Sequence, residues 1–257
     1  MGKIIAVANQ KGGVGKTTTS VNLAASLAAT KRAVLLVDLD PQGNATMGSG
    51  IDKQQLEISS YDLLMNDKPA DQVIVDSTEG KYALIPSNSD LTGAEVALLK
   101  EIAREVRLRS ALETIQDIYD FILIDCPPSL NMLTVNALVA ANSVMIPMQC
   151  EYYALEGLTG LLDTIEKIRK HLNPNLKIEG LLRTMYDPRN NLATQVSAQL
   201  IDHFGEKVYR TIIPRNVRLA EAPSHGLTAL KYDKSSSGAV AYLALAGEIL
   251  RREGIAA

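Results

Sequence analysis

Lys11-Gly12-Gly13-Val14-Gly15-Lys16-Thr17-Thr18 lies between an apolar run that is typical of a strand and a pattern that is typical of a helix. Its glycines allow the backbone to turn its N–H groups inward, with no Cβ in the way of a bound phosphate. The helix that follows directs its positive end to the same place. Because spacing and flanks both agree, we interpret the segment as a nucleotide phosphate loop rather than as a glycine-rich turn that happens to contain lysine.

Two side chains of this loop suit the charge of a nucleotide. Lys16 is placed to neutralise the β- and γ-phosphates, and the Thr17 hydroxyl is placed to bind Mg²⁺. We therefore expect Mg-ATP to bind along residues 11–18. The expected contacts, in addition to Lys16 and Thr17, are Lys11, Gly12, Gly13, Val14, Gly15 and Thr18.

Short apolar runs alternate with helical patterns along the chain, and most runs are continuous, which is typical of parallel strands covered on both faces. The sequence therefore predicts an α/β fold: a single doubly wound, mostly parallel β-sheet with helices on both faces, in one domain over residues 1–257. The stretch from Gly48 to Gly80 is expected to hold short helices and surface loops, and a final helix is expected at about Gly238 to Arg252. The expected strands are Ile4–Ala8, Ala33–Val37, Tyr82–Ile85, Phe121–Ile124, Ser143–Pro147, Ile178–Met185 and Val208–Ile213.

The composition is that of a globular protein, with 46% hydrophobic and 21% charged residues. The formal net charge of −3 does not indicate nucleic-acid binding by the chain as a whole, so a DNA site would have to be a local basic patch. The cysteines, Cys126 and Cys150, form no CxxC pair, which argues against a metal cluster or a disulfide framework. The sequence has no signal pattern and no long apolar stretch, and we expect a cytoplasmic protein.

Three aspartates stand at or just beyond the ends of apolar runs, where parallel sheets form their ligand crevice. Asp38 and Asp40 are expected to lie on an extended segment and to point the same way, so that one holds a metal-bound water while the other positions the attacking water. Both could instead be turn or N-cap aspartates. Asp125 ends a strand in the Walker B arrangement and is expected to bind Mg²⁺ through a water. Its neighbour Cys126 is interpreted as a small buried side chain rather than as a nucleophile.

Lys11 precedes the glycines, which is the deviant Walker A signature, and the chain resembles a known family at this point. The family is that of the ParA/Soj partition ATPases, within the MinD/ParA group of P-loop proteins. The resemblance covers almost the whole length and implies the P-loop NTPase form of the predicted fold. The matching segments are NQKGGVGKTTTSVNLAASLA, VLLVDLDPQGNAT, REVRLRSALE, LIDCPPSLNMLTVNAL, PMQCEYYALEGL, MYDPRNNLATQV and TIIPRNVRLAEAPSHGL.

The resemblance implies a slow, Mg-dependent ATPase that works as an ATP-dependent homodimer. It implies that Lys11 reaches across the dimer interface to the partner's nucleotide, whereas from the residue alone Lys11 could equally be a solvated loop lysine. It also implies that Asp40 orients or activates the attacking water, so the implied catalytic residues are Lys11, Lys16 and Asp40. Pro214 and Asn216 are implied to contact adenine, although an asparagine there could equally cap a helix.

Two related classes fit the sequence less well. Nitrogenase-type iron proteins need two cluster cysteines in loops that face the dimer axis, whereas Cys126 and Cys150 stand at strand ends. Division-site ATPases would need an amphipathic membrane helix at the C-terminus. Because residues 246–253 complete a core-facing helix, we expect no membrane partner.

Arginines gather in the last third of the chain, and Arg189 and Arg218 lie in family-like segments. The resemblance implies that these two bind double-stranded DNA through its phosphates, without sequence preference, when the ATP-bound dimer joins two patches. The alternative is that they are ordinary solvated arginines. The other basic residues of the region are Arg183, Lys207, Arg210, Arg215 and Lys231.

The hypothesis from sequence is therefore a nucleoid-associated ATPase for DNA segregation. A ParB-type centromere-binding protein stimulates hydrolysis, the dimer weakens and DNA is released, so that repeated cycles position a chromosome origin or a plasmid. The alternative is a nucleotide-switched regulatory protein that acts on a replication initiator or on a membrane-located partner. ATP-dependent, salt-sensitive binding to random DNA would favour the first hypothesis.

Overall fold

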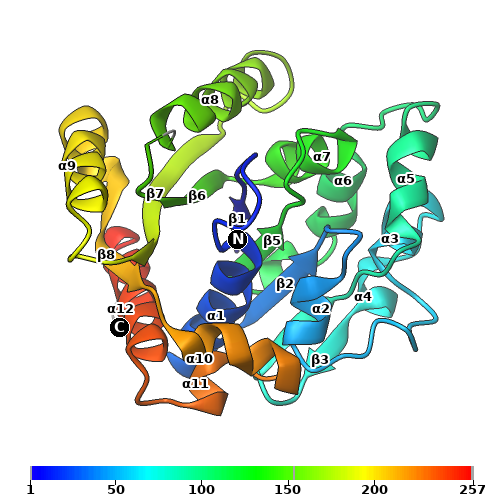
Figure 1. Ribbon diagram of the computed structural model, residues 1–257. Coiled ribbons are helices and arrows are strands. Elements are labelled where there is room, and N and C mark those ends of the chain that lie inside the picture. The colour runs from blue at the N-terminus through cyan, green and yellow to red at the C-terminus, as the bar shows by residue number, and fades with distance from the viewer. Residues whose placement is uncertain (1, 153, 256–257) are drawn as a thin grey trace.

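The computed structural model describes residues 2–152 and 154–255, and within them eight strands form one sheet in the order β3-β4-β2-β5-β1-β6-β7-β8 (Figure 1). All the strands that the sequence predicts are present, with ends close to the expected ones. The bounds are β1 Lys3–Val7, β2 Val34–Asp38, β3 Val75–Ser77, β4 Tyr82–Ile85, β5 Phe121–Asp125, β6 Ser143–Gln149, β7 Lys177–Tyr186 and β8 Val208–Pro214.

Neighbouring strands run parallel, except that β3 pairs antiparallel with β4 at one edge of the sheet. This arrangement confirms the predicted mostly parallel α/β sheet. Strand β3 is not predicted by the sequence, because three residues at an edge are too few to show a periodic pattern. In the register of β2 with β5, Asp38 lies opposite Asp125, so two of the predicted site carboxylates are brought side by side.

Helices cover both faces of the sheet, as the sequence predicts (Figure 1). On one face α1, α2, α10, α11 and α12 pack against side chains such as Ile5 and Leu36, and on the other α3 to α9 pack against Ile4 and Leu35. Because both faces of the strands are apolar, their sequences read as continuous apolar runs. The helices are α1 Lys16–Ala29, α2 Asn44–Gly48, α3 Ser60–Met65, α4 Ala70–Val73, α5 Leu91–Leu98, α6 Arg107–Glu113, α7 Met132–Ala140, α8 Ala154–His171, α9 Asn191–Phe204, α10 Val217–Glu221, α11 Ala229–Tyr232 and α12 Ser237–Arg252.

The final helix α12 faces the core, as expected. It begins at Ser237 because the Ser236 hydroxyl caps it and accepts a hydrogen bond from the Ala239 N–H at 3.2 Å. Tyr242 and Ile249 are among its buried side chains and pack in the same cluster as α1. Among the residues that the structure describes, no helix is long and apolar enough to cross a membrane.

Candidate active site

The phosphate loop follows the central strand β1 and ends where α1 begins. Gly13 and Gly15 have φ values of 73° and 86°, in the left-handed region that favours glycine. A Cβ on Gly12 or Gly13 would meet no atom within 4 Å, so both glycines border open space at the amino end of α1. The free N–H groups of the first helical turn and the positive end of the helix suit a phosphate in this space.

Side chains at the ends of β6 and β7 hold the loop in this shape. The Thr184 hydroxyl donates to the Val14 carbonyl at 2.7 Å, and Gln149 Nε2 donates to the Gly13 carbonyl at 3.0 Å. Sequence reasoning misses both residues. The available signal is a polar side chain at the carboxyl end of an apolar strand, which becomes specific only when the strand order shows that β6 lies beside β1.

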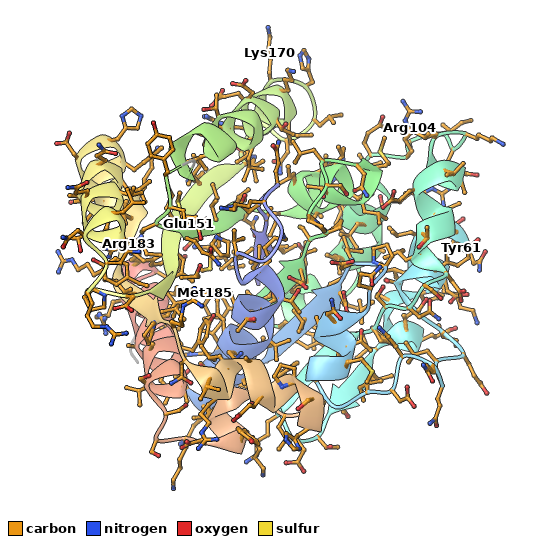
Figure 2. The ribbon with its side chains drawn as sticks, viewed as in Figure 1. Tyr61, Arg104, Glu151, Lys170, Arg183 and Met185 are labelled. Carbon is orange, nitrogen blue, oxygen red and sulfur yellow. The ribbon has the colours of Figure 1, made fainter. Side chains whose placement is uncertain are left out.

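The two lysines of the loop have different surroundings. The Lys16 ammonium donates to the Lys11 carbonyl at 3.2 Å and is almost buried, and burial lowers the pKa of Lys16 while Asp125 opposes the shift. The Lys11 ammonium is half exposed and contacts the carboxylate of Glu151, which follows β6. Figure 2 shows Glu151 on the β6–β7 side of the molecule, near Met185. Within one chain, Lys11 is thus held by a carboxylate beyond β6.

A magnesium corner lies between α1 and β5. The Thr17 hydroxyl donates to Asp125 Oδ2 and the Ser20 hydroxyl donates to Asp125 Oδ1, both at 2.8 Å. Asp125 is fully buried, and burial, followed by the charge of Asp38, raises its pKa. A hydroxyl and a carboxylate oxygen are ligands that Mg²⁺ prefers, so Thr17 and Asp125 fit the cation that the sequence predicts. Ser20 is not predicted, although it lies three residues after Thr17 on the same face of the helix.

Asp38 ends strand β2, and Asp40 directly precedes the turn that leads into α2. Asp38 Oδ1 accepts from the Asp40 N–H at 3.1 Å, and Asp40 Oδ1 accepts from the Gln42 N–H at 2.9 Å. Both side chains thus accept from backbone N–H groups two residues further on, as in the alternative interpretation as turn aspartates, while Asp38 keeps the extended geometry that the sequence predicts. Asp38 is fully buried, and burial raises its pKa, whereas the Asp40 side chain is 8% exposed.

A cavity of about 330 Å³ lies beside the phosphate loop, a volume in the usual range of ligand sites. Its lining includes Gly15 and Thr18 from the loop side, and Pro214 and Asn216 after β8. The residues predicted to contact adenine therefore border the predicted phosphate site. Its wall also includes Met185, whose φ of 49° places a non-glycine residue in the left-handed region, a feature that concentrates at functional sites.

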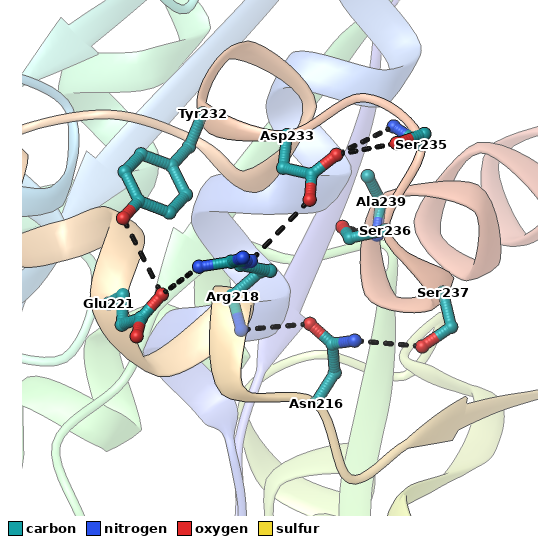
Figure 3. A network of polar contacts seen from close by, with 9 residues as sticks. All are labelled: Asn216, Arg218, Glu221, Tyr232, Asp233, Ser235, Ser236, Ser237 and Ala239. Carbon is teal, nitrogen blue, oxygen red and sulfur yellow. Dashed lines mark hydrogen bonds and ion pairs between the residues drawn. The ribbon is translucent and has the colours of Figure 1, made fainter.

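Asn216 also caps α10, so the alternative interpretation of this residue is present in the structure. Its Oδ1 accepts from the Arg218 N–H at 3.0 Å, and its Nδ2 donates to the Ser237 hydroxyl at 2.8 Å (Figure 3). The cap joins the start of α10 to the start of α12. One side chain therefore has both roles: it caps a helix and lines the cavity.

The two arginines predicted to bind DNA lie on segments that leave neighbouring strands. Arg189 follows β7 with its side chain 88% exposed and is paired with Asp187 at 2.7 Å. Arg218 lies on α10, after β8, and its guanidinium pairs with Glu221 at 2.8 Å and with Asp233 at 3.5 Å (Figure 3). In the β7–β8 register Tyr186 lies opposite Pro214, so both segments start from the same edge of the sheet.

Arg183, one of the basic residues in the last third of the chain, is buried rather than solvated. It is 5% exposed and donates to the Ser197 hydroxyl at 2.9 Å and to the carbonyls of Tyr209 and Arg210 at 2.7 and 3.2 Å. The β7–β8 register shifts on both sides of Arg183, so the arginine lies at an irregular part of this ladder. Cys126 is fully buried, as expected, and burial raises the pKa of its thiol.

Comparison with known proteins finds related sequences over almost the whole chain. A family model described as an AAA domain matches residues 2–178. An uncharacterized protein of Pseudomonas putida is 66% identical over 98% of this chain and 96% of its own length. The sporulation initiation inhibitor protein Soj of Bacillus subtilis is 57% identical over 97% of this chain and 98% of its own. The chromosome partitioning protein ParA of Myxococcus xanthus is 52% identical over 98% and 89%, respectively.

Solved structures share the fold over almost the whole chain. A cobyrinic acid a,c-diamide synthase from Mycobacterium smegmatis, with bound ADP and magnesium, has a TM-score of 0.86 at 39% identity and covers 99% of this chain and 96% of its own. The septum site-determining protein MinD of Pyrococcus horikoshii, in complex with Mg-ADP, has a TM-score of 0.82 at 26% identity over 99% and 98%. Both neighbours thus hold a nucleotide together with magnesium.

Proposed function

The chain belongs to the ParA/Soj family of partitioning P-loop ATPases, and on this basis we propose that its ATP-bound dimer binds DNA without sequence preference and releases it on hydrolysis. The protein is an ATPase that uses ATP and Mg²⁺, and its role is ATP-dependent partition. One observation carries the finer proposal. The segments that bear Arg189 and Arg218 leave β7 and β8 side by side, and the second of them also lines the nucleotide cavity.

In the proposed reaction the phosphates of ATP lie on the loop backbone, with Lys16 beside the β- and γ-phosphates. Thr17 and Asp125 would hold Mg²⁺, Asp125 through a water, and the cation supplies charge that stabilises the transferring phosphoryl group. Asp40 orients the attacking water toward the γ-phosphate. The base occupies the cavity beside Pro214 and Asn216.

We propose that Lys11 completes the site of a partner subunit. Its ammonium is half exposed and its pairing with Glu151 involves two exposed side chains, which is a weak kind of ion pair in water. A nucleotide phosphate offered by a second copy is a stronger acceptor for the lysine than an exposed carboxylate. Turnover should therefore be slow in a single chain, since the charge around the γ-phosphate is completed only in the dimer.

In the proposed cycle the dimer joins the Arg189 and Arg218 segments of two copies into one basic strip. Phosphate contacts from arginines carry no sequence information and release counterions, so binding is indifferent to sequence and steeply salt-dependent. A ParB-type centromere-binding protein then stimulates hydrolysis, and loss of the γ-phosphate removes the acceptor for Lys11 and weakens the dimer. The ATP-bound protein is thereby placed on nucleoid DNA.

The first experiment measures binding to a random-sequence duplex with ATP, with ADP and without nucleotide, at two salt concentrations. The wild-type protein should bind only with ATP, and more weakly at high salt. An Arg189→Ala/Arg218→Ala variant should lose binding. Arg109→Ala is the matched control, since it removes an arginine from an exposed ion pair on α6. Absence of binding in every nucleotide state would contradict the DNA role.

A second experiment tests the role of Asp40. The Asp40→Ala variant should bind ATP and DNA like the wild type and should show no turnover, because the phosphate loop and the arginines are intact. Nucleotide binding is measured with a fluorescent ATP analogue, and turnover by phosphate release. Normal turnover in this variant would show that the water is oriented by another group.

A further inference from the structure

Ser87 lies at the exit of β4 and is bound to the turn that carries Asp40, although 47 residues separate the two. Its hydroxyl donates to the Asp40 carbonyl at 2.9 Å, and its own N–H donates to the Thr46 hydroxyl at 2.8 Å. Ser87 and Thr46 are both fully buried. Two groups of one residue therefore bind the loop that follows β2, at Asp40, and the first turn of α2, at Thr46.

Thr46 links Ser87 to Asp38, which in turn binds Asp40, so that four residues form a closed network of hydrogen bonds. Its N–H and its hydroxyl both donate to Asp38 Oδ2, at 2.8 and 2.7 Å, while Asp38 Oδ1 accepts from the Asp40 N–H at 3.1 Å. The Asp40 backbone is thereby held at its N–H through Asp38 and at its carbonyl through Ser87. Charged acceptors in a dry interior make such hydrogen bonds strong and directional.

The loop also packs directly against the backbone of Ser87. Gly43 has a φ of 58°, and a Cβ built on it would lie 2.6 Å from the Ser87 carbonyl oxygen. The Gly43 N–H donates to the Asp40 carbonyl at 2.9 Å, so this carbonyl has two donors. Loss of the Ser87 hydroxyl would leave the carbonyl satisfied by Gly43, and it would remove a side-chain hydrogen bond that joins the Asp40 turn to the exit of β4.

We propose that Ser87 and Thr46 are positioning residues for ATP hydrolysis, which fix the direction of the Asp40 carboxylate. The inference rests on the proposed role of Asp40. Hydrolysis requires the water oxygen to lie in line with the γ-phosphorus and the leaving oxygen, and the carboxylate to be within hydrogen-bond reach of the water. A displacement of about 1 Å far from the chemistry can lower a rate by about 100-fold. Binding of ATP depends on the phosphate loop and the base cavity. Among the described residues, the lining of the cavity does not include Ser87 or Thr46, and their side-chain hydrogen bonds join them to Asp38, the Asp40 carbonyl and each other.

The test compares Ser87→Ala with Ser77→Ala. Ser77 is also buried and also donates its hydroxyl to a backbone carbonyl, that of Ser49 at 2.8 Å, but it lies on the edge strand β3. Both variants should lose a similar amount of thermal stability. Ser87→Ala should reduce kcat by about 10- to 100-fold with little change in the KM or the affinity for ATP, and Ser77→Ala should keep normal turnover.

Thr46 provides a second, independent pair of variants. Thr46→Ser keeps the hydroxyl that joins Asp38 to Ser87 and should keep kcat within a few-fold of the wild type, whereas Thr46→Val has the same shape without the hydroxyl and should lower kcat as Ser87→Ala does. Asp40→Asn is measured beside them. If Asp40→Asn is inactive while Ser87→Ala and Thr46→Val turn over normally, the positioning inference is wrong. If Asp40→Asn itself is active, the failure lies in the proposed role of Asp40.

Discussion

Replacing Asp125 by asparagine should stabilise the protein without nucleotide and should abolish its response to Mg-ATP. The carboxyl group is fully buried and faces Asp38 across the β2–β5 ladder. Burial, and then the charge of Asp38, raise the pKa of Asp125 to about 8. A raised pKa means that the folded state disfavours the carboxylate, so the stability associated with this group is present below pH 3.8 and is lost as the pH rises toward about 8.

The size of the effect follows from this burial. One pKa unit corresponds to about 1.4 kcal/mol, and a shift of several units costs the folded protein roughly 4 kcal/mol at pH 7. The amide avoids this cost, but its single carbonyl keeps one of the two hydroxyl hydrogen bonds from Thr17 and Ser20, a loss of about 1 kcal/mol. Lys16 also loses a neighbouring negative charge. The expected net gain is about 2 kcal/mol, or about 4 to 8 °C in the unfolding midpoint of a chain of this size.

The assay is thermal unfolding at pH 7, first in EDTA and then with excess Mg-ATP. The variant should unfold at a higher temperature than the wild type in EDTA. Mg-ATP at 100 times its dissociation constant should stabilise the wild type by about 2.7 kcal/mol and should leave the variant unchanged. Asp120→Asn is the control, because Asp120 is an exposed carboxylate next to the other end of β5 that accepts from the Ala33 N–H at 2.8 Å. The Asp120→Asn variant should lose a little stability and should still be stabilised by Mg-ATP.

The pH dependence separates the charge effect from a packing effect. The difference between wild type and Asp125→Asn in EDTA should shrink toward pH 4, where both forms of residue 125 are neutral in the folded protein. A variant that is no more stable than the wild type at pH 7, or a difference that does not change with pH, would refute the reasoning. In that case the hydrogen bonds from Thr17 and Ser20 offset the free-energy cost of burying the Asp125 carboxylate.

The structure predicts two further effects. Gly160→Ala would place a methyl 2.9 Å from the Gln10 amide, which is the far end of a flexible side chain, so Gln10 should shift and the affinity for ATP should change little. On the same helix α8, Gly157→Ala meets no atom within 4 Å and should raise stability by about 0.5 to 1 kcal/mol. A fluorescent ATP analogue and thermal unfolding compare the two variants. Arg183→Met should lower stability by about 2 to 3 kcal/mol, because the carbonyls of Tyr209 and Arg210 lose a charged donor. At a temperature where the variant is folded, its DNA affinity should depend on salt concentration with the same slope as that of the wild type. A smaller slope would show that Arg183 contacts DNA.

The central part of the fold is predictable from sequence because its signals are local. Continuous apolar runs identify the strands that are covered on both faces, and the glycine spacing of the loop fixes where α1 begins. The contact of Thr17 with Asp125 is also predictable, since each residue occupies a defined position in its own motif. Parallel topology then brings the two motifs to the same edge of the sheet.

The site residues that the sequence does not predict are brought to the site by the order of the strands, which no local pattern specifies. Gln149 and Ser87 contact the site because β6 lies beside β1 and β4 lies beside β2. The role of Arg183 is also not predictable, because an arginine in an apolar strand gives no local signal that it will bind the carbonyls of Tyr209 and Arg210 on β8. The sequence leaves open whether Asp38 and Asp40 bind the backbone of the following turn, because a spacing of two fits both an extended strand and a turn.

In the proposed function, the strand order places the residues for hydrolysis and the residues for DNA binding at different parts of the carboxyl edge of the sheet (Figure 1). Asp40 and Asp125 follow or end β2 and β5 on one side of the phosphate loop, whereas Arg189 and Arg218 follow β7 and β8 on the other. Strand β6 lies between β1 and β7, and its Gln149 binds the phosphate loop at the Gly13 carbonyl. Because Asp40 lies outside the phosphate loop, its replacement should alter turnover at constant DNA affinity, whereas loss of Asp125, which contacts Thr17, should also remove ATP-dependent DNA binding. Changes on the β7–β8 side should alter DNA affinity at constant intrinsic turnover, unless they displace the base.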